Sequence, residues 1–242
     1  MSIVVLVPSR GRPDRAAEAF ASFRATARLS TTRWVLGIDW DDPERTRYIE
    51  AFAQRSDRRF GWDPDEPFVV VLQAWETGDL ARATNGLWRR FGDSADILGS
   101  VNDDMLFRTE GWDERVTAAL ARPGIAFGDD GFQHDALVTS PFITAGIPQA
   151  LGWYALPTCE HLFIDNAWGD IGRGIGRLEY LSDVLIEHIH PLAGKADWDE
   201  GYERANDRRT TDHDRIAYER WRDRGGRQAD IAKVRSRLAV AA

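Results

Sequence analysis

Short runs of aliphatic residues alternate with longer amphipathic stretches through the first part of the chain. The short runs are typical of buried strands, and the amphipathic stretches are typical of helices. The pattern predicts a helix that Asp14 caps, helices at 44–55 and 80–91, and strands at 3–7, 34–38, 68–72 and 97–101. This alternating order with short connections predicts an α/β fold with a doubly wound, mostly parallel sheet.

The alternation is looser after residue 107. On the last predicted strand, Val184, Ile186, His188 and His190 share one face because side chains alternate along a strand. From Trp198 onward the pattern is helical, with a break at Gly225 and Gly226. The other predicted elements are a helix at 113–121, strands at 125–127, 137–143 and 183–189, and a helix that begins at Thr158 or Glu160.

Composition is that of a water-soluble globular domain, with 43% hydrophobic and 29% charged residues in 242. No apolar run approaches the roughly 20 residues of a membrane helix, so we expect no membrane insertion. The N-terminal segment lacks a basic n-region, so we expect no signal peptide. Cys159 is the only cysteine, which excludes an intrachain disulfide and favours a cytoplasmic location.

The formal charge of −8 argues against a protein that is basic over its whole surface and binds nucleic acid. Charge is unevenly distributed, however, because residues 203–242 carry eleven Lys and Arg against seven Asp and Glu. This segment either contacts phosphates or is a solvated helix with charges of mixed sign.

An acidic turn follows the fourth predicted strand, at Asn102, Asp103 and Asp104. Adjacent carboxylates after an apolar run are costly to bury without partners. One explanation is that they cap an ordinary turn. The other is a ligand site at the carboxyl end of a strand, where hard oxygen ligands suit Mg²⁺ or Mn²⁺ and a diphosphate.

Three motifs occur in a characteristic order: a Pro8-Ser9-Arg10 loop after the first strand, the acidic turn after the fourth, and His188 with His190 on the last. This order resembles that of GT-A fold glycosyltransferases, particularly the family 2-type enzymes that use nucleotide sugars. The resemblance implies a GT-A-like, Rossmann-like mixed sheet flanked by helices. It also implies a catalytic domain over 1–200, with a nucleotide-binding half at 1–107 and an acceptor half at 108–200, and a charged helical extension over 201–242.

The resemblance implies a set of donor-binding residues, with a UDP-sugar as the favoured donor. Arginine is apt near the phosphates because its planar fork matches their oxygens. Each position also has an ordinary structural explanation, as part of a surface loop, a turn or an amphipathic helix. The implied set is Pro8, Ser9 and Arg10 beneath the nucleotide, Arg10 or Arg12 near its phosphates, Asp39 at the base or ribose, Arg82 and Asn85 on a supporting helix, Asp103 at sugar hydroxyls or ribose, and Lys195 as a mobile cation over the diphosphate.

For the metal, the resemblance implies Asp104 as a direct ligand, with His188 or His190 completing the shell. Imidazole suits Mn²⁺ better than Mg²⁺. Asn102 stands where the family has its first acidic residue, which weakens the expected affinity for the metal. The alternative is one histidine in the core and one at the rim.

The acceptor is expected along residues 139–168, as a carbohydrate or another hydroxyl-bearing molecule, with DNA left open by the basic tail. Asp165 is favoured over Glu160 as the general base of an inverting reaction. Phe142, Trp153, Tyr154 and Trp168 offer stacking faces or are core residues, and Asp129, Asp130 and His161 offer hydrogen bonds.

Two other functions fit the same motifs. A nucleotidyltransferase would use similar metal and phosphate chemistry, although its expected glycine-rich loop with a lysine is replaced here by a loop with Gly11 alone. A non-catalytic protein that binds a cation or nucleotide would bind the cation but not turn over a nucleotide sugar.

Overall fold

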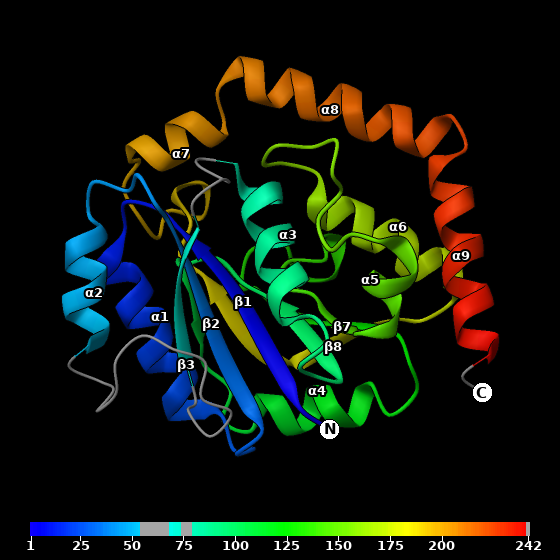
Figure 1. Cartoon of the computed structure of the whole chain (residues 1–242), viewed down its shortest axis with the longest axis horizontal. Helices are drawn as coiled ribbons and strands as arrows, with labels where there is room; N and C mark the ends of the chain where they lie inside the picture. The colour runs from blue at the N-terminus through cyan, green and yellow to red at the C-terminus, as the bar shows by residue number, and fades with distance from the viewer. Residues whose placement is uncertain (54–67, 74–78, 241–242) are drawn as a thin grey trace.

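The first strand, β1 (Ile3–Ser9), is buried along its whole length because helices cover both of its faces. Ile3, Val5 and Val7 belong to one hydrophobic core, which includes Phe20 and Phe23 of α1 (Pro13–Thr26). Val4 and Leu6 belong to a second core with α3 (Leu80–Phe91). The computed structural model describes residues 1–53, 68–73 and 79–240. Within them it has the three-layer architecture of a doubly wound sheet (Figure 1).

The sheet has eight described strands in the order β3-β2-β1-β4-β7-β6-β8-β5. β3, β2, β1 and β4 are mutually parallel, and β6 is parallel to β8. β7 is antiparallel to both of its neighbours, and β5 is antiparallel to β8. The predicted mixed, mostly parallel sheet is therefore confirmed. The remaining bounds are β2 (Thr32–Asp39), β3 (Phe68–Gln73), β4 (Ile97–Ser100), β5 (Met105–Phe107), β6 (Ile125–Asp129), β7 (Phe142–Thr144) and β8 (Leu178–His188).

The C-terminal segment is helical, as predicted. α7 (Glu200–Ala205) and α8 (Arg208–Asp223) cross the top of the sheet, and α9 (Gly226–Val240) descends beside α5 and α6 (Figure 1). Gly225 has φ +90° and makes the predicted break between the two long helices. The other helices are α2 (Arg45–Ala53), α4 (Trp112–Ala119), α5 (Gly146–Leu151) and α6 (Ile164–Ile175), with 3₁₀ turns at His134–Ala136 and Pro191–Ala193.

The region around Pro8 differs from the prediction. The strand continues through Pro8 instead of ending at Val7. β1 pairs with β4 only as far as Leu6, so the missing N–H of Pro8 falls where the β4 ladder has already ended. Asp14 does not cap α1, since the helix begins at Pro13, which needs no N–H donor in the first turn.

Elements of the second half begin elsewhere than predicted. The strand predicted from 137 starts only at Phe142, because Ser140 has φ +51° and precedes Pro141. α6 starts at Ile164, after Phe163 at φ +64°, and not at Thr158 or Glu160. Both β5 and α5 were missed, because each is very short. The predicted end of α2 at Arg55 lies outside the described residues.

No helix among these residues combines the length and the apolar character needed to cross a bilayer.

Phe107 lies in an aromatic cluster that joins α1, β2, β5 and α4. Its ring centroid is 4.6 Å from that of Trp112 and 5.6 Å from that of Phe23. We expect Phe107→Ala to lower the free energy of unfolding by about 3–5 kcal/mol in urea denaturation, because it leaves a cavity in a packed core. Ile216→Ala, on a half-exposed side chain, is the control and should change stability by less than about 0.5 kcal/mol. A loss below about 1 kcal/mol for Phe107→Ala would contradict this packing.

Candidate functional site

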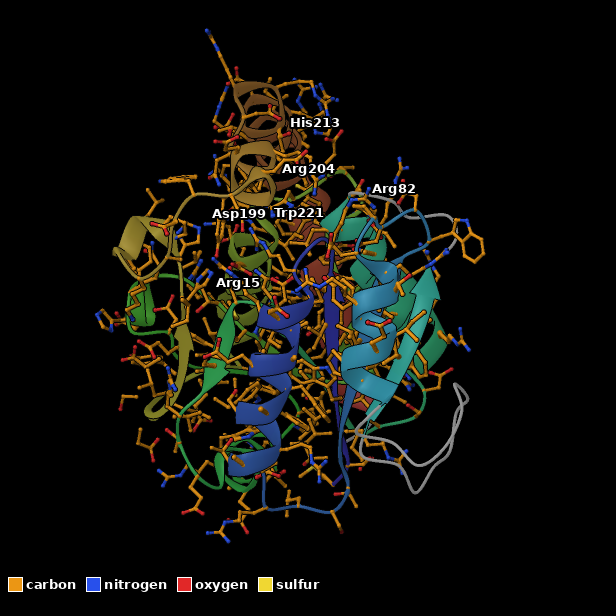
Figure 2. The ribbon with its side chains drawn as sticks, turned by 90° about the vertical axis from the view of Figure 1, so that its left-hand side faces the viewer. Arg15, Arg82, Asp199, Arg204, His213 and Trp221 are labelled. Atoms are coloured by element: carbon orange, nitrogen blue, oxygen red, sulfur yellow. The ribbon has the colours of Figure 1, made fainter. Side chains whose placement is uncertain are left out.

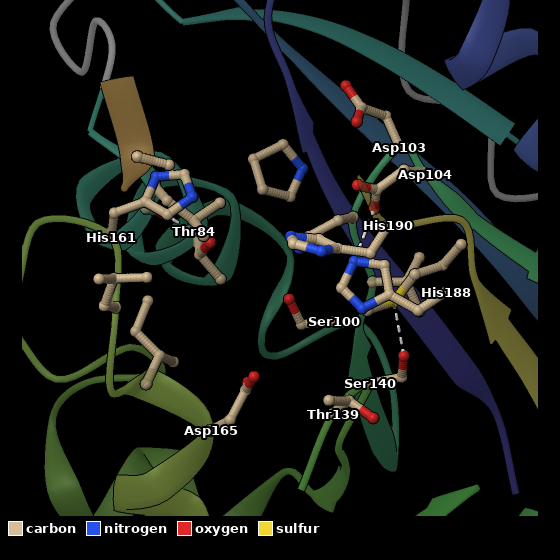
Figure 3. A pocket seen from close by; sticks show the side chains of 18 of the residues that line it. Thr84, Ser100, Asp103, Asp104, Thr139, Ser140, His161, Asp165, His188 and His190 are labelled. Atoms are coloured by element: carbon tan, nitrogen blue, oxygen red, sulfur yellow. Dashed lines mark hydrogen bonds and ion pairs between the residues drawn. The ribbon is translucent and has the colours of Figure 1, made fainter. Parts of the chain in front are cut away.

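A cavity of about 440 Å³ opens at the carboxyl ends of β1, β2 and β4, beside the end of β8 and beneath α7. This is where open α/β sheets bind their ligands. Figure 3 shows the two aspartates of the acidic turn and both histidines on one side, with His161 and Asp165 across the cavity. Of the predicted donor, metal and general-base residues, those that line it are Pro8, Ser9, Arg10, Arg12, Asp39, Asp103, Asp104, Asp165, His188 and His190.

The loop after β1 is held in place by two side chains from the region after β2. Asp42 accepts a hydrogen bond from the Gly11 amide at 2.8 Å, and the Tyr48 hydroxyl accepts one from the Arg12 amide at 2.8 Å. The Ser9 hydroxyl lies 2.6 Å from Tyr48 and donates to Asp103 at 2.5 Å. The loop is therefore tied to the acidic turn before any ligand binds.

Arg10 is already engaged within the protein. One of its nitrogens, Nη1, pairs with Asp39 at 2.9 Å and with Asp41 at 2.5 Å. This ion pair aligns the end of β1 with the end of β2 at the rim of the cavity.

The two carboxylates of the acidic turn differ in how they are satisfied. Both oxygens of Asp103 are paired, Oδ2 with Ser9 and Oδ1 with Arg12 at 3.3 Å. Oδ2 of Asp104 accepts a hydrogen bond from Tyr202 at 2.6 Å, whereas its buried Oδ1 has no hydrogen-bond partner among the described residues. Asp104 therefore has an oxygen available for a ligand, and Asp103 does not.

His188 faces that oxygen, with Nε2 lying 3.4 Å from Oδ1 of Asp104. The ring of His190 is 4.8 Å from the ring of His188, and its Nδ1 accepts a hydrogen bond from the Leu192 amide, so only Nε2 is left for a ligand. Residues far apart in the sequence thus meet at the ends of β4 and β8.

The surroundings shift the pKa values of Asp103 and Asp104 in opposite directions and raise the pKa of His188. Burial and the neighbouring Asp104 raise the pKa of Asp103 to about 6. Burial opposes ionisation of Asp104, but His188, Tyr202 and Arg12 prevail and lower its pKa to about 2. Burial likewise opposes protonation of His188, but Asp104, Asp130 and Asp165 raise its pKa. Asp104 and His188 therefore each favour the ionised form of the other.

Asp165 lies in the first turn of α6 and borders the cavity. Burial raises its pKa to about 7, with Asp130 adding to the effect and His188 opposing it. No described residue donates a hydrogen bond to its carboxylate. A carboxylate whose pKa is near neutrality can accept a proton from a bound hydroxyl.

Helix α7 forms a wall of the cavity that the sequence did not predict. Tyr202 and Arg204 line the cavity and come from the segment expected to be a charged helical extension. Asp199, just before that segment, lies near Arg204 (Figure 2). Asp199 Oδ1 pairs with Arg12 at 2.5 Å. The only local signal was an Asp three residues before Tyr202, which is typical of a helix N-cap and indicates nothing about a cavity.

Four predicted site residues lie outside the cavity lining. Asn85 is buried and uses its amide to hold the backbone of Tyr154 and Ala155. Arg82 is 72% exposed and points outward at the start of α3 (Figure 2). The other two are in ion pairs, Lys195 with Glu187 at 2.9 Å and Glu160 with Arg209 at 2.9 Å.

The aromatic residues considered for the acceptor are core residues. Phe142, Trp153, Tyr154 and Trp168 are all at most 7% exposed, and only Tyr154 borders the cavity. Asp129 and Asp130 are also outside the lining, because their oxygens hold the turn at 131–134. His161 does line it, and burial lowers its pKa to about 4.

The residues present fit a divalent cation whose shell is shared with a ligand. Within the described part of the chain, no group of three or more His, Cys, Asp and Glu side chains converges as a metal site. Oδ1 of Asp104 and Nε2 of His188 would supply two ligand atoms, and the first is a buried oxygen without a hydrogen-bond partner among the described residues. Mg²⁺ and Mn²⁺ sites in phosphate-binding enzymes commonly complete such a pair with phosphate oxygens and water.

No protein-family model and no curated protein sequence matches the chain. Solved structures do match its fold. The chain is similar to S. aureus TarS, with a TM-score of 0.57 and 11% identity over 77% of this chain and 37% of that one. It therefore spans well under half of the longer TarS chain. A shorter TarS, solved in complex with UDP, gives a TM-score of 0.56 at 12% identity, over 99% of this chain and 90% of that one.

The chain is also similar to mannosyltransferase PcManGT from Pyrobaculum calidifontis, solved with GDP-Man and Mn²⁺. The TM-score is 0.61 at 12% identity, over 99% of this chain and 74% of that one. A further structural match is 4-diphosphocytidyl-2C-methyl-D-erythritol synthase from Anaerococcus prevotii. Its TM-score is 0.52 at 8% identity, over 75% of this chain and 86% of that one. The GT-A-like fold is therefore confirmed, and these low identities show the fold alone.

Asp214 of α8 ties the C-terminal segment to the cavity wall. It is fully buried and accepts hydrogen bonds from the amides of Glu160, His161 and Leu162 at 2.7–2.8 Å. We expect Asp214→Asn to lower the free energy of unfolding by about 2 kcal/mol, because the amide group cannot accept all three bonds. Asp212→Asn, on a half-exposed side chain of the same helix, is the matched control.

The pH dependence of this loss has a definite sign. Burial opposes ionisation of Asp214, but the three amides and His213 lower its pKa below the ordinary value near 4. Its contribution is therefore fully present above about pH 5 and is lost as the pH falls through the native pKa. Urea denaturation should show the gap between wild type and Asp214→Asn closing towards pH 3. A gap that is constant with pH would contradict the assignment.

Proposed function

We propose that the protein is a glycosyltransferase that moves a sugar from a nucleotide-sugar donor, a UDP-sugar being favoured, to an acceptor hydroxyl. One observation carries the proposal: Arg12, Asp104 and His188 meet in one cavity at the strand ends, in a GT-A-like fold. Structures of that fold include complexes with GDP-Man and Mn²⁺, with UDP and with UDP-GlcNAc.

Asp104 and His188 would hold Mn²⁺ or Mg²⁺, with His190 adjacent. When bound, such a cation offsets the negative charge that develops on a departing nucleoside diphosphate. Arg12 contributes a fixed positive charge at the same place, and its orientation is set before binding because its amide and guanidinium are both held.

The nucleotide would lie over the ends of β1 and β2. Pro8 and Ser9 supply the floor, and Asp39 lies where it can accept hydrogen bonds from ribose or base. Arg10 pairs with both Asp39 and Asp41 and thereby positions the Asp39 carboxylate.

Asp165 acts as the general base in this proposal. It takes the proton from the acceptor hydroxyl as the oxygen forms its bond to the anomeric carbon and the bond to the diphosphate breaks. The base lies across the cavity from the acidic turn (Figure 3), which favours attack from the side opposite the leaving group and thus inversion. Leu162 and His161 border the same part of the cavity and would contact the acceptor.

A nucleotidyltransferase is the second candidate, favoured by the structural similarity to the diphosphocytidyl-methylerythritol synthase. That reaction would release pyrophosphate from a nucleoside triphosphate and a sugar phosphate. Pyrophosphate release from triphosphates, with no turnover of any nucleotide sugar, would favour it over the glycosyltransferase.

Nucleotide binding should depend on the metal through Asp104. In isothermal titration with a panel of nucleoside diphosphates, we expect one nucleotide to bind tightly only when Mn²⁺ is present. Asp104→Asn should weaken that binding by more than about tenfold, because a direct ligand is lost. Asp93→Asn, which is exposed and outside the cavity lining, should behave like wild type. Equal binding by Asp104→Asn and wild type would show that the metal assignment is wrong.

Asp165→Asn should remove turnover while leaving nucleotide binding intact. We expect the rate of nucleoside diphosphate release from the donor to fall by about 10²-fold or more. In wild type the rate should rise with pH through about 7, as Asp165 ionises. A variant that retains full turnover would exclude Asp165 as the base.

Although Asp165→Asn should lower turnover, it should raise the stability of the protein at high pH. Because the native pKa of Asp165 is raised, its ionisation destabilises the fold as pH rises from about 4 through about 7. Asp165→Asn should therefore gain thermal stability over wild type at pH 8 and not at pH 4. This readout needs neither donor nor acceptor.

A further inference from the structure

Arg12 is shared among three carboxylates. Its Nη1 lies 3.3 Å from Asp103 and 3.8 Å from Asp104, and its Nη2 lies 2.5 Å from Oδ1 of Asp199. The guanidinium also lies 4.0 Å above the ring of Tyr202. The nearest and most exposed of the three carboxylates, Asp199, comes from outside the acidic turn.

The segment that carries Asp199 also reaches the proposed metal ligand. Tyr202 donates a hydrogen bond to Oδ2 of Asp104, and Arg15 donates one to the Tyr202 hydroxyl at 2.7 Å. We call residues 199–205 the strap. The strap thus contacts both Arg12 and Asp104, and donor binding depends on these two side chains in the proposed function.

A diphosphate and Asp199 are in conflict at this place. Both are anions that bind a guanidinium through oxygen atoms, and two anions against the same nitrogen repel each other strongly when water is largely excluded. Arg12 is only 15% exposed, so a diphosphate has little other access to its charge. Asp199, at 36% exposure, is the partner that can turn away towards solvent.

We infer that the strap is an internal competitor of the donor: the Asp199 carboxylate occupies the phosphate-binding face of Arg12, and the donor diphosphate displaces it. The inference rests on the proposed function and adds to it two residues, Asp199 and Tyr202, that set donor affinity.

Displacement of Asp199 has a consequence for α7. Asp199 is the N-cap of this six-residue helix and accepts a hydrogen bond from the Tyr202 amide at 3.0 Å. A helix this short depends on its cap and on its contacts. When Asp199 leaves Arg12, α7 loosens and the Tyr202 hydroxyl is released from Asp104. Donor binding therefore opens the strap.

The test uses Asp199→Asn, which keeps the shape and the capping oxygen but removes the charge. Isothermal titration of UDP and of GDP, each with Mn²⁺, should give a dissociation constant about fivefold lower than that of wild type, as expected for loss of one partly exposed ion pair. Glu200→Gln removes the neighbouring strap charge, which has no ion pair among the described residues, and should leave the constant unchanged.

Hydrogen exchange gives an independent readout on the wild-type chain. Amide exchange in the peptide spanning 198–206 should rise when UDP or GDP and Mn²⁺ bind. Slower exchange would mean that the strap closes over the donor, and it would overturn the inference. An Asp199→Asn variant that binds the nucleotide no more tightly than wild type would overturn it as well. If wild type binds neither nucleotide at millimolar concentration, the proposed function and the inference fall together.

Discussion

Two adjacent carboxylates, Asp103 and Asp104, are buried to 5% and 4% exposure where β4 ends, and the cavity is built around this costly arrangement. Each carboxylate requires a positive partner or a proton. Arg12 comes from the loop after β1, which is paired in parallel with β4, and His188 comes from the end of β8, which pairs with β5 just after the acidic turn. Strand register therefore decides which charges can meet.

The same burial lowers the stability of the native state. Asp103 and Asp165 both have pKa values raised by desolvation, so keeping them ionised at neutral pH destabilises the native state. Natural proteins tolerate such local costs at functional sites and offset them elsewhere. Here the offset includes the aromatic cluster around Phe107 and the hydrogen bonds of Asp214, which fasten α8 to the cavity wall.

Periodicity predicted the first half of the fold, because strand ends and alternation are local properties of a sequence. The aliphatic run of β1 and the helix 80–91 are examples. The meeting of Asp104 with His188 is a long-range contact that was implied only by the resemblance to GT-A enzymes. Asn85 could not be assigned in this way, since its role depends on the backbone of Tyr154, distant in sequence. Tyr202 was missed for the same reason: no local pattern reveals that a charged tail folds back over a cavity.

In the proposed function, Asp104, His188 and a nucleoside diphosphate share one divalent cation. Electron–nuclear double resonance of Mn²⁺ bound to the protein with UDP measures this directly, because it detects nuclei within bonding distance of the metal. We expect ³¹P coupling from the diphosphate and ¹⁴N coupling from one imidazole, with the nitrogen signal lost in His188→Gln. Bound Mn²⁺ with no ³¹P coupling, or a nitrogen signal unchanged in His188→Gln, would contradict it.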